Sequence, residues 1–142
     1  MAELTIERVF NAAPARVFAF ITESENLVKW WGPEGMSLPE HALDFTRLGP
    51  WNSTMQNSDG QRFHVSGQVT SVDAPHLVAF TWAWHDESGN RGEESHVTMT
   101  VKAAENGRTA FTLVHRKLGE EAAVNHEKGW TSSLVKLERL AS

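Results

Sequence analysis

Histidine is the residue type with the clearest chemical potential in this chain, and the sequence holds seven of them. His115 alternates with Phe111 and Leu113, so an extended segment would turn all three side chains to the same, inner side. His126 lies one helical turn before Trp130 in a segment with helical spacing. Two imidazoles in one pocket could orient a polar group of a ligand or exchange a proton with it. The alternative is that His115 is a buried, hydrogen-bonded structural residue and that His126 lies at a helix edge.

The other histidines form no recognised metal-binding pattern. A zinc site needs three or four converging ligands, often at helical or short-loop spacing. His85 and His96 flank one polar loop and could meet across a hairpin, but no two histidines are four residues apart and no HEXXH pattern occurs. The chain has no cysteine, no GxSxG serine motif and no glycine-rich phosphate loop. We therefore expect no metal and no cofactor, and His115 is the catalytic candidate.

Length and composition limit the class of protein. A chain of 142 residues, 40% hydrophobic and 22% charged, predicts one globular domain over residues 1–142. A net charge of −5 disfavours nucleic-acid binding, which needs a basic face. No run approaches the roughly 20 apolar residues that span a bilayer, and the first ten residues alternate like a strand rather than a signal peptide. We expect a cytoplasmic protein with no membrane partner.

Several regular elements must position the histidines. The longest helical pattern covers residues 120–140, with one stripe of apolar or semi-polar side chains at Ala123, His126, Trp130, Leu134, Leu137 and Ala141. Residues 3–11 alternate as a strand, and two short helices follow, one starting at Pro14 and one that Thr22 or Ser24 could cap. Strand-like runs then cover residues 41–47, 51–57, 62–72, 77–85, 94–103 and 108–116, with hairpin turns predicted at Ser58-Asp59-Gly60 and Asn106-Gly107. This order predicts an α+β domain of antiparallel strands with a terminal helix.

Alternation along the strands predicts which side chains face the long helix. The inward sets are rich in aromatic and flexible side chains: Trp51, Ser53 and Met55; Val78, Phe80, Trp82 and Trp84; Ser95, Val97, Met99 and Val101; Phe111, Leu113 and His115. The chain has six Trp but only two Ile, whereas a fully packed core more often uses branched aliphatic residues. Gly129, in the middle of the predicted helix, could allow a strand or loop to approach or leave room for a ligand beside Trp130. The composition favours a cavity.

Four stretches of the sequence resemble a known family in order and spacing. They are ERVFNAAPARVFAFITESENLVKWWGP, LDFTRLGPW with the following Met and Asp-Gly, GQVTSVDAPHLVAFTW, and HEKGWTSSLVKLERL. Together they resemble the bacterial homologues of the C-terminal domain of the activator of the heat-shock-ninety ATPase, in the START-like, SRPBCC superfamily. The resemblance covers nearly the whole chain. It implies a helix-grip fold, in which an antiparallel sheet curves around the C-terminal helix with a hydrophobic cavity between them.

The resemblance also implies which residues line that cavity: Trp30, Trp31, Trp82, His115 and Trp130. One position departs from the family pattern. Where the family usually has a glycine pair, this chain has Gly49-Pro50 followed by Trp51, and we expect the additional indole to narrow the mouth of the cavity.

The first functional hypothesis is binding of a small hydrophobic or aromatic molecule. The predicted ligand-binding residues are Trp30, Trp31, Met55, Phe80, Trp82, Met99, Phe111, Leu113, His115, His126, Trp130 and Leu134. A second hypothesis is a cyclase or hydrolase in the same cavity, with His115 as general acid and base. A third is a chaperone-regulating module that uses the surface around Trp30 and Trp31, although the extra domain and charged linker of a full cochaperone are not expected here. A homodimer is the expected assembly if the protein self-associates.

Overall fold

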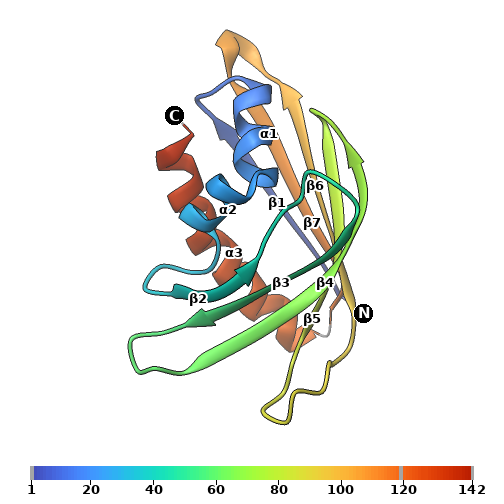
Figure 1. Cartoon of the computed structure of the whole chain (residues 1–142). Coiled ribbons are helices and arrows are strands. Elements are labelled where there is room, and N and C mark those ends of the chain that lie inside the picture. Colours follow the sequence, from blue (N-terminus) through green and yellow to red (C-terminus); the bar gives the residue numbers. More distant parts are fainter. Residues whose placement is uncertain (1, 119, 142) are drawn as a thin grey trace.

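The chain forms a curved sheet of seven antiparallel strands with a long helix across it, in a computed structural model that describes residues 2–118 and 120–141 (Figure 1). The strands are β1 (Ala2–Phe10), β2 (Ser37–Ala42), β3 (Gly49–Gln56), β4 (Arg62–Asp73), β5 (Leu77–Trp84), β6 (Ser95–Ala103) and β7 (Thr109–Leu118). The helices are α1 (Pro14–Thr22), α2 (Ser24–Trp30) and α3 (Glu120–Leu140), with a 3-10 turn at Glu105–Gly107. The predicted α+β, helix-grip fold is confirmed.

The strand order is β1-β7-β6-β5-β4-β3-β2, so every adjacent pair except β1–β7 consists of strands that follow one another in the sequence. The turns lie where the sequence predicts them. Between β6 and β7, Asn106 and Gly107 have positive φ values of 59° and 73°, which tight hairpin turns require. Gly60 has φ of 82° between β3 and β4.

No helix among the described residues is long and apolar enough to cross a membrane.

The two short helices lie where the sequence predicts them, but their caps differ. Pro14 occupies the first turn of α1, where its missing N–H group is not needed. The N-cap of α2 is Glu23, which makes no side-chain capping hydrogen bond, so the prediction of Thr22 or Ser24 is wrong. Thr22 instead donates its hydroxyl proton to the carbonyl oxygen of Phe18 at 2.7 Å, inside the end of α1.

The predicted strand at residues 41–47 is shifted toward the N-terminus. The strand is β2, and residues 43–48 run outside the sheet. Leu43 and Phe45 are 1% and 0% exposed, so their alternation reflects two side chains that enter the core from a loop. The backbone N–H of Phe45 donates to the carbonyl oxygen of Thr22 at 2.8 Å, which ties this loop to the end of α1 rather than to a strand.

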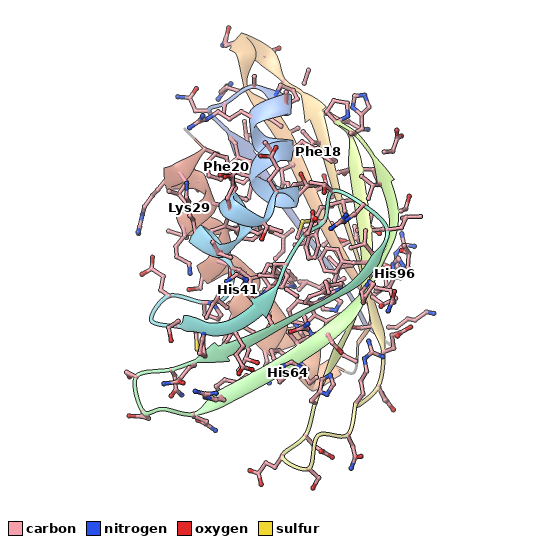
Figure 2. All side chains as sticks on the ribbon, in the orientation of Figure 1. Phe18, Phe20, Lys29, His41, His64 and His96 are labelled. Carbon is pink, nitrogen blue, oxygen red and sulfur yellow. The ribbon has the colours of Figure 1, made fainter. Side chains whose placement is uncertain are left out.

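The inward sets of side chains are buried as predicted, with one exception. Trp84, the last residue of β5 before the polar loop, is 38% exposed. On α3 the stripe residues Trp130, Leu134, Leu137 and Ala141 are buried, while the side chain of Ala123 lies outside the described part. Figure 2 shows side chains filling the space between the sheet and the helices, with His96 on the outer side of the sheet.

Candidate functional site

Trp31 is the centre of an aromatic cluster between the sheet and α3. Its main-chain position is the C-cap of α2, and its side chain is 2% exposed. Its indole lies 5.6–6.4 Å, between ring centroids, from the rings of Trp30, Phe45, Trp51, Phe80, Trp82 and Trp130. Most of these contacts are edge-to-face, an arrangement that aromatic quadrupoles favour. The cluster thus joins the end of α2, strands β3 and β5, and α3.

A cavity of about 160 Å³ lies at one end of this cluster. Its walls come from the segment after α2, from β3 and β5, and from α3: Trp31, Gly32, Pro33, Met55, Trp82, Trp84, Asn125, His126, Gly129, Trp130 and Ser133. None of these lining residues is an acid, a lysine or an arginine. Trp84 and Asn125 are exposed, so the cavity reaches the surface beside them.

The loop that closes one side of the cavity is attached to α3. Gly32 turns the chain with φ of 86°, and a Cβ there would lie 2.9 Å from the sulfur of Met55, so the loop approaches β3 closely. The backbone N–H of Glu34 donates to the hydroxyl of Ser132 at 2.9 Å, and the Glu34 carboxylate pairs with Arg139 at 3.1 Å. The ion pair is exposed and contributes little to stability.

The structure brings some of the predicted ligand-binding residues to the cavity and not others. Trp31, Met55, Trp82, His126 and Trp130 line it. The remaining seven are buried in the core and are not part of its wall: Trp30, Phe80, Met99, Phe111, Leu113, His115 and Leu134. The predicted set also lacks Gly32, Pro33, Trp84, Asn125, Gly129 and Ser133, although the sequence placed Trp84 on the inward face of its strand and Gly129 where a ligand could lie beside Trp130. The signal for three of them was present, because residues 125, 129 and 133 are spaced by one helical turn.

A chain of hydrogen bonds below the cavity defines the state of His115. The indole N–H of Trp130 donates to Nδ1 of His115 at 3.2 Å, and an indole nitrogen can only donate. Nδ1 is therefore unprotonated, and the ring proton is on Nε2, which lies 2.7 Å from the hydroxyl oxygen of Ser95. The Ser95 hydroxyl in turn donates to the carbonyl oxygen of Trp82 at 3.2 Å. Each polar atom of His115 is satisfied in one neutral tautomer.

Both imidazoles near the cavity are held in the uncharged form. Burial lowers the pKa of His115 to about 3, with further lowering by the neighbouring His126 and His96. Burial also lowers the pKa of His126 to about 4. The two rings are 4.5 Å apart between centroids, so protonating both would place two positive charges side by side. His126 lines the cavity and contacts Trp82 at 5.5 Å, whereas His115 is fully buried behind it.

Trp51 does not narrow the mouth of the cavity. Its side chain is 1% exposed, it is not a lining residue, and its indole N–H donates to the carbonyl oxygen of Thr81 at 3.1 Å. Trp51 is paired across β3 and β4 with Gly67, where a Cβ would lie 2.7 Å from the indole nitrogen. The missing side chain at Gly67 allows the indole to lie against the sheet, so it fills the core instead of the entrance.

His85 and His96 do not form the pair that a hairpin would allow. His85 instead packs on His64, with 4.4 Å between ring centroids, and its Nε2 lies 2.7 Å from the hydroxyl of Ser66. His96 is on β6, in register with Thr81 and Arg116. Among the side chains that the structure describes, no three of His, Cys, Asp or Glu are grouped so that they could hold a metal ion.

A curved antiparallel sheet around a C-terminal helix, with an aromatic cavity between them, defines a START-like helix-grip domain. The chain belongs to the family described as "Activator of Hsp90 ATPase homolog 1-like protein" (AHSA1), whose family model matches residues 11–142. The predicted family membership is confirmed.

Solved structures agree with this assignment. The AHSA1 protein of Silicibacter pomeroyi is 51% identical, with a TM-score of 0.92 over 97% of this chain and 96% of that chain. A Chromobacterium violaceum protein is 20% identical, with a TM-score of 0.85 over 99% of this chain and 98% of that one. A Mycobacterium smegmatis protein is 24% identical, with a TM-score of 0.82 over 99% and 90%. The last two share the fold alone. A comparison with curated proteins gave no match.

Proposed function

We propose that this protein binds a small hydrophobic or aromatic molecule in the cavity between the sheet and α3. The observation that carries the proposal is the cavity itself, which is open to the surface and walled largely by indole rings, and whose described lining residues include no acid, lysine or arginine. Small-molecule sites in proteins are typically concave, mostly apolar and supplied with a few polar groups. The polar side-chain groups of its described wall are the Asn125 amide, the His126 imidazole, the Ser133 hydroxyl and the indole N–H groups of Trp82 and Trp84, since those of Trp31 and Trp130 donate within the protein.

The size of the cavity limits the ligand. A volume of about 160 Å³ is close to the ~150 Å³ that suffices to hold a benzene ring in a dry protein cavity. The ligand is therefore a single-ring molecule, or one ring of a longer molecule that leaves the cavity beside Trp84. Burying about 150–200 Å² of apolar ligand surface corresponds to roughly 4–5 kcal/mol before binding costs. Even without those costs, 4–5 kcal/mol corresponds to dissociation constants of roughly 0.2–1 mM, so we expect single-ring probes to bind with dissociation constants of about 1 mM or weaker.

Binding is better supported than catalysis. The alternative assigns His115 as general acid and base, but its two ring nitrogens are occupied by Trp130 and Ser95 and its side chain does not reach the cavity. A general base must lie within hydrogen-bonding distance of the proton that it removes. The same geometry suits a residue that stiffens the wall of a binding site.

Binding is also better supported than regulation of a chaperone through the surface around Trp30 and Trp31. The family name refers to activation of the Hsp90 ATPase. However, the two side chains are 0% and 2% exposed, and the indole nitrogens donate to Phe20 and Ser53 inside the protein. Residues used in this way are core residues and offer no docking surface.

Ligand-detected NMR and intrinsic Trp fluorescence with single-ring aromatic probes test the proposal. We expect saturable changes in the wild type and their loss in Gly129→Met, because the new side chain would occupy the cavity. Val135→Met places the same side chain on α3 at a position that is 40% exposed, and it should bind as the wild type does. Saturation that is equal in both variants would contradict this location for the site. Absence of binding to every probe would refute the proposal.

A further inference from the structure

The six indole N–H groups are not equally satisfied. Four buried ones donate within the protein: Trp30 to Phe20, Trp31 to Ser53, Trp51 to Thr81 and Trp130 to His115. Trp84 is 38% exposed. Trp82 is 6% exposed, and its Nε1 is the buried side-chain nitrogen or oxygen atom that has no hydrogen-bond partner among the described residues. The described residues therefore provide acceptors for the other buried indoles and none for this one.

An unpaired buried donor is unusual, because the large majority of buried side-chain polar atoms in native proteins have a hydrogen-bond partner. Trp82 lines the cavity and contacts Trp31, His126 and Trp130, with ring centroids 5.7, 5.5 and 5.4 Å away. A molecule bound among these rings lies against the ring of this indole, but Nε1 itself is buried, so an acceptor oxygen reaches it when the indole or its neighbours shift on binding. An oxygen atom on that molecule would complete the hydrogen bonding of the core.

The charge of the walls argues for an uncharged ligand. Among the described lining residues the ionisable side chain is His126, and burial lowers its pKa to about 4, so it is neutral at physiological pH. His115, behind the wall, is also neutral. A carboxylate or an ammonium group placed here would lose its hydration without gaining a counter-charge. Aromatic walls alone do not compensate for that loss.

We propose that the ligands of this cavity are uncharged aromatic molecules with one hydrogen-bond-acceptor oxygen, such as aryl ketones, aldehydes, esters or ethers, and that Trp82 Nε1 donates to this oxygen. The inference rests on the proposed function, since it identifies the chemical class that the same cavity selects. The rings of Trp31 and Trp130 supply apolar contact, and Trp82 supplies the specificity.

Three probes of equal heavy-atom number and similar shape test this inference: acetophenone, isopropylbenzene and benzoate. They present a ketone oxygen, no acceptor, and an anion. We expect acetophenone to bind and benzoate to bind more weakly than either neutral probe. The ratio of acetophenone to isopropylbenzene affinity should fall about 5–20-fold in Trp82→Phe, which keeps a ring but removes the donor. Trp84→Phe, which changes another wall indole, should keep the ratio of the wild type.

A second test measures the hydrogen bond directly in the wild-type protein and uses a variant only to assign the signal. In ¹H–¹⁵N spectra of the wild type, acetophenone should move one indole resonance downfield, and isopropylbenzene should not; Trp82→Phe assigns the resonance by its loss. If none of the three probes binds, the proposed function fails and the inference with it. If the neutral probes bind with the same ratio in wild type and Trp82→Phe, or if benzoate binds most tightly, binding stands and the inference alone is overturned.

Discussion

Trp130 donates its indole proton to Nδ1 of His115 at 3.2 Å, so one hydrogen bond joins α3 to β7 inside the core. Because the indole can only donate, this contact also determines which ring nitrogen of His115 carries a proton. The helix, the last strand and, through Ser95, strand β6 are thereby connected by groups that are all buried.

Substitution of His115 should destabilise the protein strongly. His115→Ala leaves the Trp130 indole and the Ser95 hydroxyl without their partner and opens a cavity, so we expect a loss of about 3–5 kcal/mol in the free energy of unfolding. His115→Gln offers an acceptor and a donor on one side chain and should lose clearly less. Urea unfolding of the three proteins measures both effects, and equal losses in the two variants would show that the hydrogen bonds contribute little.

Stability should fall as the pH decreases from 7 to 5. The folded-state pKa values of His115 and His126 are lowered to about 3 and about 4, from an ordinary value of 6.5. In this range the unfolded chain binds more protons than the folded protein, so the free energy of unfolding increases with pH. The stability that the two neutral histidines contribute is therefore lost progressively as the pH drops below 6.5. The two groups together correspond to about 4 kcal/mol between pH 7 and pH 5.

Urea unfolding at intervals between pH 5 and pH 7 measures this slope. His126→Gln removes one of the two titrating groups from the pair and should reduce the slope by roughly half. A slope that is the same with and without His126 would show that its imidazole is not held in the neutral form by the fold.

Gly129→Ala should stabilise the protein. The nearest atom to a new Cβ is Cγ of Pro33 at 3.8 Å, an ordinary van der Waals contact. Replacing glycine by alanine within a helix contributes about 0.5–1 kcal/mol. Thermal unfolding should show a higher midpoint, and a lower one would mean that the helix needs the glycine for a reason other than space.

Gly67→Ala should have the opposite effect, although the substitution is the same. A Cβ at Gly67 would lie 1.9 Å from the carbonyl oxygen of Thr81 on the neighbouring strand. Because the backbone of the neighbouring strand can move only at a high energetic cost, we expect the free energy of unfolding to fall by about 3 kcal/mol or more. Gly129→Ala is the matched control, and near-neutral thermal stability in Gly67→Ala would contradict the close strand packing described here.

The fold could be predicted from the sequence because alternation and turn residues are local signals. Inward faces such as Val97 with Met99, and Phe111 with Leu113, follow directly from parity along one strand. The failure at residues 41–47 has the same origin, since Leu43 and Phe45 alternate although their segment is a loop. Burial creates the pattern, and a strand is only one way to achieve burial.

The candidate site was less predictable, because a cavity depends on distances between elements. Parity placed Phe80 and Trp82 on the same inner face of β5, but only Trp82 reaches the cavity and Phe80 is packed against Phe45. The hydrogen bonds around His115 join residues far apart in the chain, and no local pattern encodes them. The lack of an acceptor for the Trp82 indole among the described residues likewise depends on neighbours from several elements, which no local pattern encodes.

The pairing of β1 with β7 has a consequence for biosynthesis. Residues 4–10 find their partners in residues 109–115, at the far end of the sheet-forming segment. A growing polypeptide therefore cannot complete the sheet until residues 109–118 have emerged from the ribosome, several seconds after β1 at ~5–20 residues per second. During that interval the aromatic surface of β3 and β5 is without its covering helix. Nascent chains of this protein should consequently be substrates for ribosome-associated folding factors, and their folding should be slow compared with that of helical proteins of equal length.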